Sequence, residues 1–522
     1  MAGSPAPTRP GSDGRVVADD IGPASRETHS GVVLLLGERA YKFKKPIDLG
    51  FLDFRSVPAR AECCRREVEL NRRLAPDVYL GLGRLSGPTG GPDEPTVVMR
   101  RMPERTRLTT LVRDGAELTA VMDRIARMMA TFHATARRAP EIDAAARPPA
   151  ILRRWESTFA DVRRDSTTVL AAADVDRADH LVHGFLTGRD RLFQDRIRHG
   201  RIVDGHGDLL CDDIFCLPDG PRVLDCLEFD DRLRFVDGLD DIAFLAMDLE
   251  HLGAPSLARL LVDRYTDYAA DPAPGSLWHH YLAYRAYVRV KVACLRHRQG
   301  DPDAATQARS LAALAGEHLR AGRVRLILIG GLPGSGKSTV AASTADLLSA
   351  VLISSDVTRQ AAAAGEGVLT AAAPAAYRRG RYDRPHLART YGELLRRAEL
   401  CLGAGDTVVV DASFTQAGYR AAAAEVAART HADLVPMSCQ APTAVRNDRL
   451  RRRPPGPSEA TPEIAERMAR DEDPWPDAIV VDTAGSIDDT MRRVRQIVGP
   501  PVGTFDHSPG PPARAGSRSQ GR

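Results

Sequence analysis

Residues 331–338 carry the residue types and spacing of a loop that binds nucleotide phosphates. The run Gly-Leu-Pro-Gly-Ser-Gly-Lys-Ser follows an apolar stretch and precedes a helical pattern. Its glycines let backbone N–H groups turn toward phosphate oxygens, and the following helix places its positive end there. Lys337 would reach the terminal phosphates and Ser338 would bind Mg²⁺. We therefore predict an ATP site built from Gly331, Leu332, Pro333, Gly334, Ser335, Gly336, Lys337, Ser338 and Thr339.

Two charged residues lie one strand and one helix farther along the chain. Asp356 ends the predicted strand at 350–356, where an acceptor would bind at the carboxyl edge of a sheet. Its carboxylate would take a proton from an acceptor hydroxyl, and Arg359 would hold the acceptor or its charge. The alternative is that Asp356 caps the next helix.

A further acid and two arginines complete this group. Asp411 ends the strand predicted within 406–413, which suits an acid that orients Mg²⁺ or its bound water. Arg449 and Arg453 are four residues apart, so they share one helical face. They would close over the transferring phosphoryl group and neutralise its charge. The alternative is a solvated basic face.

A second group of acids lies in "HGDLLCDDIF", residues 206–215. Kinase chemistry needs one carboxylate to position the acceptor hydroxyl and two groups to hold metal ions. Asp208 fits the first role, while Asp213 and, after a predicted hairpin, Asp225 fit the second. Glu228 competes with Asp225 as a metal ligand, and spacing alone does not separate them.

The N-terminal strands supply a lysine for the same chemistry. Lys42, in Ala-Tyr-Lys on a predicted strand, would hold the α- and β-phosphates, with Glu67 on the following helix as its ion-pair partner. Lys44 shares the face of Lys42 because strand residues alternate faces. Lys44 or Lys45 is therefore an alternative inward-pointing lysine.

The elements that must position these residues follow two patterns. Residues 28–100 predict strands with one helix, 115–200 and 238–320 predict helices, and 202–229 predict short strands. The strands in 28–100 include a hairpin that turns at Gly37, Glu38 and Arg39. After a boundary near 320–323, strands and helices alternate, which indicates a parallel sheet covered by helices.

The second half, about 324–499, resembles the small P-loop kinases, namely gluconate kinase, the zeta toxins and the kinase domain of polynucleotide kinase. The resemblance rests on the phosphate loop and on the spacing from Lys337 to Asp356 and Arg359. It also rests on Arg449 and Arg453, which come later in the chain. In those kinases the corresponding aspartate activates the acceptor hydroxyl. The segment 454–463 also resembles their substrate-side lid.

Residues 28–315 resemble the aminoglycoside phosphotransferase and choline kinase superfamily through the "HGD" loop at 206–208. The usual pattern has asparagine where Asp213 stands, and the added charge would alter metal demand or turnover. The whole chain resembles the bacterial bifunctional aminoglycoside phosphotransferase/ATP-binding proteins, also through 40–54, 65–81 and 240–250. That family name is weak evidence for aminoglycosides as substrates.

The resemblance implies two domains and two tails. An α+β protein-kinase-like bilobal domain is expected at 26–318, followed by an α/β P-loop kinase domain, a parallel sheet covered by helices, at 324–499. Residues 1–25 and 500–522 have the composition of disordered tails.

Composition limits the partners. The net charge of +3 and the aromatic share of 5% argue against a nucleic-acid partner. No apolar run approaches the roughly 18 residues of a membrane span, and the first 25 residues lack the apolar core of a secretion signal. We therefore expect a cytoplasmic protein with reduced thiols.

These patterns predict an enzyme that transfers the γ-phosphate of ATP to a hydroxyl of a small molecule, at one or both domains, with Mg²⁺ as cofactor. One alternative is a nucleotide-dependent regulatory protein in which one kinase domain is degenerate. Another is a polynucleotide-type end kinase. The patterns name neither the acceptor nor the oligomeric state.

Overall fold

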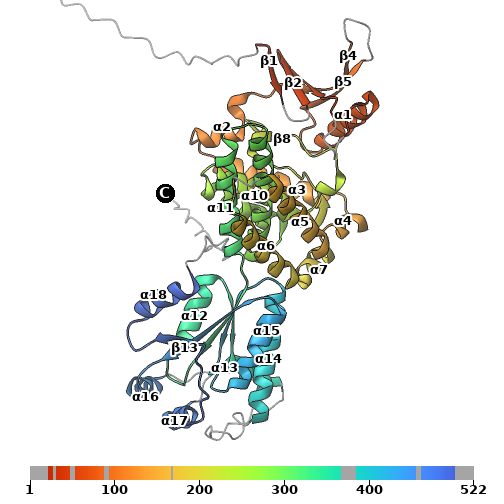
Figure 1. The fold of residues 1–522 in the computed structure, drawn as a ribbon. Coiled ribbons are helices and arrows are strands. Elements are labelled where there is room, and N and C mark those ends of the chain that lie inside the picture. Colours follow the sequence, from red (N-terminus) through yellow and green to blue (C-terminus); the bar gives the residue numbers. More distant parts are fainter. Residues whose placement is uncertain are drawn as a thin grey trace, which may run out of the picture. The chain divides into compact units, whose positions relative to one another are not determined.

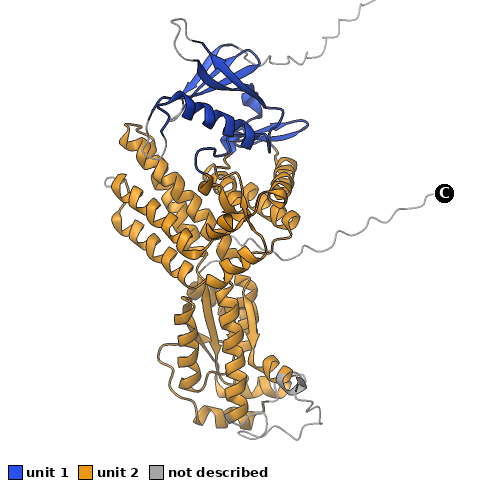
Figure 2. Ribbon diagram, turned by 90° about the vertical axis from the view of Figure 1, so that its right-hand side faces the viewer, with its two compact units in different colours: residues 1–116, 211–230 blue, residues 117–210, 231–522 orange. Residues whose placement is uncertain are grey.

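The computed structural model describes residues 22–27, 31–47, 53–86, 93–165, 169–365, 384–453 and 460–499. Its internal contacts divide the chain into two compact units, residues 1–116 with 211–230 and residues 117–210 with 231–522 (Figure 2). The predicted tail at 500–522 lies outside the described residues, and so does most of the predicted tail at 1–25 and of the lid-like segment 454–463. Strand β1 begins at Ala24, one residue before the predicted end of the first tail.

The first unit contains a five-stranded antiparallel sheet. β2 and β3 form the predicted hairpin, in which Gly37 supplies the left-handed residue at φ 57°. Arg39 was predicted in the turn, but it is the first residue of β3 and pairs with Leu36. In sheet order, the strands are β1 (Ala24–Glu27), β2 (Gly31–Leu36), β3 (Arg39–Lys44), β5 (Glu94–Arg100) and β4 (Tyr79–Leu85) (Figure 1).

Helix α1 (Val57–Asn71) packs on this sheet. The Ser56 side chain caps its start by accepting the N–H of Ala59 at 3.3 Å. Buried Cys64 and Val68 on α1 lie in one apolar cluster with strand residues of β3 and β5. The same helix face carries Glu67, whose side chain is fully buried. The unit also contains η1 (Glu104–Thr106), α2 (Leu108–Arg113), η2 (Cys211–Asp213), β7 (Ile214–Leu217) and β8 (Gly220–Val223).

The second unit begins with a helical part. Its core surrounds α10, whose Trp278 and Leu282 are fully buried, and the ring of Trp155 stacks on Phe159 at 5.2 Å between centroids. The helices are α3 (Thr119–Thr135), α4 (Pro140–Ala144), α5 (Pro148–Asp165), α6 (Ala172–Thr187), α7 (Asp190–Arg198), α8 (Gly238–His251), α9 (Pro255–Ala269), α10 (Gly275–Arg298) and α11 (Ala304–Ala321). A short antiparallel pair, β6 (Ile202–Asp204) and β9 (Phe235–Asp237), lies among them, together with η3 (Asp231–Leu233).

The same unit continues into a five-stranded sheet in which all strands are parallel. In sheet order, the strands are β11 (Val351–Ser354), β12 (Val408–Asp411), β10 (Arg325–Gly330), β13 (Asp433–Gln440) and β14 (Ile479–Asp482). The helices are α12 (Lys337–Leu348), α13 (Ser355–Gly365), α14 (Arg384–Gly403), α15 (Ala417–Arg429), α16 (Thr443–Arg452), α17 (Pro462–Arg470) and α18 (Ile487–Val498).

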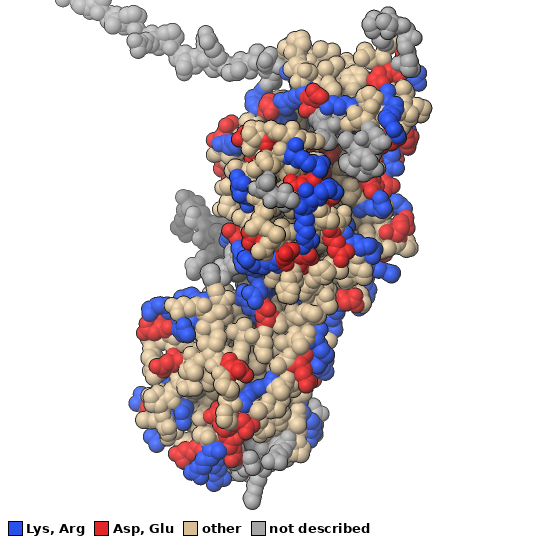
Figure 3. All heavy atoms as spheres, viewed as in Figure 1, with Lys and Arg blue, Asp and Glu red and all other residues tan. Residues whose placement is uncertain are grey.

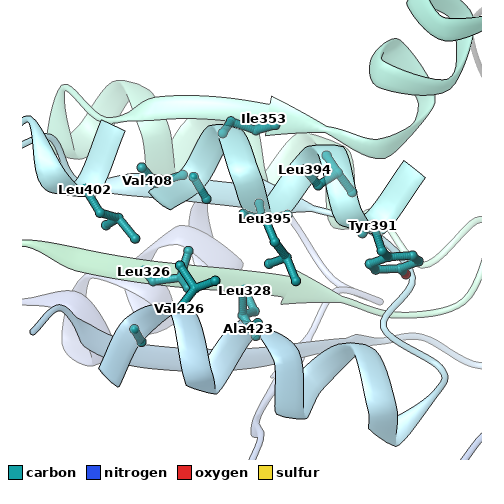
Figure 4. Packing of buried hydrophobic residues seen from close by; sticks show 14 of the residues in the cluster. Leu326, Leu328, Ile353, Tyr391, Leu394, Leu395, Leu402, Val408, Ala423 and Val426 are labelled. Atoms are coloured by element: carbon teal, nitrogen blue, oxygen red, sulfur yellow. The ribbon is translucent and has the colours of Figure 1, made fainter. Parts of the chain in front are cut away.

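Alternation along β10 explains why helices cover both faces of this sheet. Leu326 and Leu328 pack with residues of α14 and α15 on one face (Figure 4). Ile327 and Ile329 pack with residues of α12 and α18 on the other face. Because successive strand residues point to opposite faces, a continuous apolar run is buried on both.

The predicted fold class is confirmed: a protein-kinase-like α+β bilobal domain precedes an α/β P-loop kinase domain with a helix-covered parallel sheet. The predicted domain boundaries stay a prediction; α11 ends at Ala321 and β10 begins at Arg325. Within the described ranges, no helix has both the length and the apolar character needed to cross a bilayer.

Charged side chains of both signs are interspersed over the face shown in Figure 3. Ion pairs at the surface include Arg163 with Asp176 and Asp179 at 2.9 and 2.8 Å. The sequence has 72 basic and 69 acidic residues, so this pairing fits a net charge of only +3.

Candidate functional site

The phosphate loop joins the end of β10 to the start of α12, and its backbone requires glycine. Gly331, Gly334 and Gly336 adopt φ angles of 137°, 81° and 82°. A Cβ at Gly331 would lie 2.5 Å from the carbonyl oxygen of Cys439, and one at Gly334 would lie 2.6 Å from that of Arg446. Positive φ and lack of space therefore both exclude other residues here.

The loop ends at the positive end of a helix. Gly336 is the N-cap of α12, and Lys337, Ser338 and Thr339 form its first turn. Backbone N–H groups and the helix dipole thus converge where the sequence predicts phosphate. The structure places all nine predicted loop residues in one strand–loop–helix unit.

Asp411 ends β12 beside this loop and is 5% exposed. Its Oδ1 atom is buried and has no hydrogen-bond partner among the described residues. Burial and nearby Asp356 raise the pKa of Asp411 above its usual value, although Lys337, the Ser338 hydroxyl and Arg453 act to lower it. These four predicted residues therefore each lie within electrostatic range of Asp411. A buried carboxylate oxygen without a partner fits Mg²⁺ or water bound to it.

Asp356 and Arg359 are paired with each other. Arg359 donates from Nη1 to Oδ1 of Asp356 at 3.0 Å, and both side chains are largely buried. Asp356 was predicted to end a strand, but β11 ends at Ser354 and Asp356 is the second residue of α13. An N-cap residue precedes the first helical residue, so Asp356 does not hold that position.

The two predicted arginines have different surroundings. Arg449 donates from Nη2 to the carbonyl oxygen of Thr483 at 2.6 Å and from Nη1 to that of Gly334 at 3.4 Å. Its guanidinium thus contacts the backbone of the phosphate loop and of the segment that follows β14. Arg453, the C-cap of α16, has an exposed side chain within electrostatic range of Asp411.

Sequence reasoning missed Thr483 and Trp475. The Thr483 hydroxyl donates to the carbonyl oxygen of Ser335 at 2.6 Å, inside the phosphate loop. The Trp475 ring packs so closely that a Cβ at Gly330 would lie 2.3 Å from it, and Arg420 lies over the ring at 5.2 Å. Thr483 directly follows β14, and positions that follow parallel strands share one sheet edge. That signal was available in the sequence.

A cavity of about 640 Å³ opens beside the phosphate loop. Gly331, Leu332 and Ser335 line it from the loop, and residues of β13, β14 and α16 complete it. Its volume lies in the range of small-molecule sites, which is about 300–1,000 Å³.

The predicted lysine–glutamate pair is present in the first unit. The Nζ atom of Lys42 lies 2.8 Å from Oε1 of Glu67 and also pairs with Asp225. Burial alone would lower the pKa of Lys42, but the carboxylates of Asp225 and Glu67 hold it well above its usual value. Lys42 is therefore an ammonium ion fixed between two carboxylates.

Lys42, Asp213 and Asp225 line one cavity of about 950 Å³. The N–H of Leu224 donates to the carbonyl oxygen of Asp213 at 2.9 Å, which ties the two acidic positions together. Glu228 is buried and pairs with Lys44. In the described part of the chain, Glu228 does not line this cavity. The apolar walls are Val33, Leu35, Ala40, Met99, Met102, Phe215, Leu217 and Leu224.

Two carboxylates facing one cavity fit Mg²⁺ that takes its other ligands from phosphate and water. No group of three or more histidine, cysteine, aspartate or glutamate side chains arranged for a metal occurs in the described ranges.

Asp208 lies on a braced loop in the second unit. The backbone N–H groups of His206 and Gly207 donate to Asp241 at 2.6 and 2.8 Å. Arg285 donates to the carbonyl oxygen of Gly207 at 3.0 Å. These bonds fix the backbone directly before Asp208, whose side chain is half-buried.

Asp241 is itself positioned by a buried histidine that sequence reasoning missed. Its Oδ2 lies 3.1 Å from Nε2 of His133, and Nδ1 of that ring lies 2.8 Å from the hydroxyl of Tyr265. Burial would raise the pKa of Asp241, but His133, His206 and Arg285 together hold it well below its usual value. Asp241 is therefore an ionised anchor for the loop.

We predict that Lys337→Ala lowers the number of Mg·ATP molecules bound per chain from two to one, because it removes the ammonium group of the phosphate loop. Calorimetric titration of the full-length protein gives this number. Lys291→Ala is the control, since Lys291 lies on α10 and its Nζ atom is 3.6 Å from Oδ2 of Asp161. Two sites remaining after Lys337→Ala would contradict the assignment.

We predict that Asp411→Asn raises the thermal midpoint of the nucleotide-free protein by about 2–4 °C but reduces the further rise caused by Mg·ATP. The pKa of Asp411 is higher in the folded protein than in the unfolded chain. The free energy of unfolding therefore falls as the pH rises from the usual aspartate pKa to the raised pKa, and it stays lower at neutral pH. The gain from Asp411→Asn should therefore shrink on acidification, as thermal-shift curves would show.

Asp406→Asn is the matched control for that experiment. Asp406 precedes β12 at the opposite end of the strand, and burial raises its pKa to about 6. Asp406→Asn should also stabilise the protein, yet leave the Mg·ATP effect intact. Equal Mg·ATP effects in the two variants would rule out a metal role for Asp411.

The family described as AAA domain matches residues 326–474. Among solved structures, a choline/ethanolamine kinase family protein from Mesorhizobium loti is 12% identical, covers 58% of this chain and 90% of its own, and has a TM-score of 0.37. A sugar kinase from Janibacter sp. HTCC2649 is 17% identical, covers 34% of this chain and 94% of its own, and has a TM-score of 0.27.

A curated relative matches nearly the whole chain. "Uncharacterized protein Rv2004c" of Mycobacterium tuberculosis is 43% identical over 480 residues, which cover 92% of this chain and 96% of the relative. With this identity across both domains, the chain belongs to the same family as that mycobacterial protein.

Proposed function

We propose that this protein is an ATP-dependent phosphotransferase that transfers the γ-phosphoryl group of ATP to a hydroxyl of a small molecule, with a nucleotide site in each domain. The strongest support is the arrangement around Asp411, which lies within electrostatic range of the phosphate-loop residues Lys337 and Ser338 and of Asp356 and Arg453. A cation, a hydroxyl, a candidate base and a buried acid are the parts that phosphoryl transfer needs.

In the second domain, loop N–H groups and Lys337 bind the β- and γ-phosphates. Asp356 accepts the proton of the acceptor hydroxyl as the new oxygen–phosphorus bond forms. The bond from the γ-phosphorus to the bridging oxygen breaks, and ADP leaves. Arg453 neutralises charge on the transferring group. Ser338 and Asp411 would hold Mg²⁺, which would supply positive charge to offset the charge of the phosphates.

The ion pair between Asp356 and Arg359 suits Asp356 to this role. Arg359 donates from Nη1 to Oδ1 of Asp356 at 3.0 Å and so orients the carboxylate that accepts the proton. The same guanidinium lies beside the position of the acceptor and would bind a negatively charged substituent on it.

We propose a comparable set of roles for residues of the first domain. Lys42 binds the α- and β-phosphates, Glu67 holds Lys42, and Asp208 positions the acceptor hydroxyl. Asp213 and Asp225 would hold Mg²⁺, and the shared cavity of Lys42 with these two acids supports this role.

Labelling with γ-³²P ATP tests the proposal. The full-length protein is incubated with fractionated small-molecule extracts and, separately, with oligonucleotides that carry 5′-hydroxyl ends. Label on a small molecule that disappears in Lys337→Ala or in Asp208→Ala assigns the transfer to one domain. Label only on oligonucleotides would identify an end kinase. Binding of Mg·ATP without transfer to either pool would identify a regulatory protein.

We predict that Asp356→Asn lowers phosphoryl transfer by the second domain about 100- to 10,000-fold and leaves Mg·ATP affinity nearly unchanged. The amide keeps the shape of the carboxylate but does not accept the proton. Initial rates and calorimetric titration measure the two quantities. Asp346→Asn, on the exposed side of α12, is the control and should change neither. Normal turnover of Asp356→Asn would limit Asp356 to a charge interaction with the start of α13.

A further inference from the structure

A second lysine–glutamate pair lies beside the predicted one in the first unit. The Nζ atom of Lys44 lies 2.7 Å from Oε2 of Glu67 and 2.5 Å from Oε1 of Glu228. Glu67 therefore shares its two oxygens between Lys42 and Lys44. With the pair formed by Lys42 and Asp225, five side chains form a line of alternating charge, which we call the buried charge network: Asp225, Lys42, Glu67, Lys44 and Glu228.

The members of this network depend on one another, since a buried charge is costly unless it is paired. The side chains of Glu67, Lys44 and Glu228 are 0%, 2% and 9% exposed. Burial alone would lower the pKa of Lys44, but Glu67 and Glu228 outweigh it and hold the pKa well above its usual value. Lys44 is thus a permanent cation that ties Glu228 to helix α1.

The network has one carboxylate in excess, and that carboxylate faces the cavity. Two lysines and three acids give a net charge of −1 for the five side chains. The Asp225 side chain is 47% exposed, whereas that of Lys42 is 13% exposed. A divalent cation at Asp225 would compensate the excess charge at the one member of the network with substantial exposure.

The segment 225–228, which carries both end members of the network, is held at two further points. Asp225 has a left-handed backbone at φ 64°, and its N–H donates to the hydroxyl of Tyr79 at 3.2 Å. The N–H of Cys226 donates to Oδ1 of Asn71 at 2.8 Å, and Nδ2 of Asn71 donates to the carbonyl oxygen of Glu67 at 2.9 Å. Strand β4, the end of α1 and Lys44 therefore each hold one part of the segment.

We propose that Lys44, Glu228, Asn71 and Tyr79 are positioning residues that hold the segment 225–228 so that Asp225 keeps its carboxylate in the nucleotide cavity before any ligand binds. A left-handed aspartate is an unfavourable conformation that persists only where its surroundings determine it. The inference rests on the proposed function of the first domain, because it deepens the metal-binding role of Asp225. It makes this site preorganised: binding Mg·ATP requires no ordering of the segment.

The test uses full-length protein with Lys337→Ala, so that Mg·ATP binding reports the first domain. Lys44→Met combined with Glu228→Gln removes one positive and one negative charge from the network. Glu67 keeps Lys42 as its partner. We expect the Mg²⁺ concentration for half-maximal ATP binding to rise about tenfold or more. We also expect the amide hydrogens of Asp225 and Cys226 to exchange faster, while the central β3–β5 amides keep their protection.

Two single substitutions complete the design. Tyr79→Phe removes one hydroxyl and keeps the buried ring, so it tests the same idea where the double variant fails to fold; it should raise the Mg²⁺ requirement in the same direction. Lys45→Met is the matched control, because this neighbouring lysine pairs at 2.6 Å with Glu27, whose side chain is 73% exposed. It should change neither the Mg²⁺ requirement nor the exchange rates.

An unchanged Mg²⁺ requirement in the double variant and in Tyr79→Phe would overturn the inference, even where the thermal midpoint falls, because it would reduce these residues to a purely structural role. Unchanged exchange at Asp225 and Cys226 would overturn it equally. Absence of Mg²⁺-dependent ATP binding by the Lys337→Ala protein would instead overturn the proposed function of this domain. The exchange rates would then decide separately whether the segment is held.

Discussion

A buried carboxylate needs a cation close to it, and both candidate sites are organised by this requirement. In the first unit, Glu67 has no exposed side-chain surface and is compensated by Lys42 and Lys44. In the P-loop domain, Lys337 and Arg453 act on Asp411, yet burial and Asp356 still keep its pKa above the usual value. The negative charge of Glu67 is balanced by two lysines of the protein, whereas that of Asp411 is balanced only in part. This difference indicates where positive charge from outside is needed.

The parallel sheet explains how residues far apart in the sequence meet around Asp411. The register pairs Asp411 with Ile329 of β10 on one side and with Ser354 of β11 on the other. The phosphate loop therefore begins two residues beyond one neighbour of Asp411, and Asp356 lies two residues beyond the other. Thr483 follows β14 at the same edge and bonds Ser335. Because all strands run in one direction, each connection after a strand contributes to one edge.

Local features of the site followed from the sequence, and features set by tertiary contacts did not. The phosphate loop and its following helix are contiguous, so residue spacing was sufficient to place them. Asp225 and Glu228 were not separable by spacing, because the left-handed backbone at Asp225 decides which acid reaches the cavity. The contact of Arg449 was missed because its acceptors, the carbonyl oxygens of Gly334 and Thr483, come together only in the folded sheet.

The charges in the first cavity bear on the choice between the proposed enzyme and a degenerate regulatory domain. Asp213 and Asp225 face the cavity with the buried ammonium group of Lys42. Two carboxylates oppose the negative phosphates of ATP unless divalent cations lie between them. A site that only bound nucleotide would gain affinity by losing one acid, yet here Asp213 adds a charge where an asparagine would suffice. Both acids, together with Glu67 and Lys42, are the residues that the proposed phosphoryl transfer at this site would use.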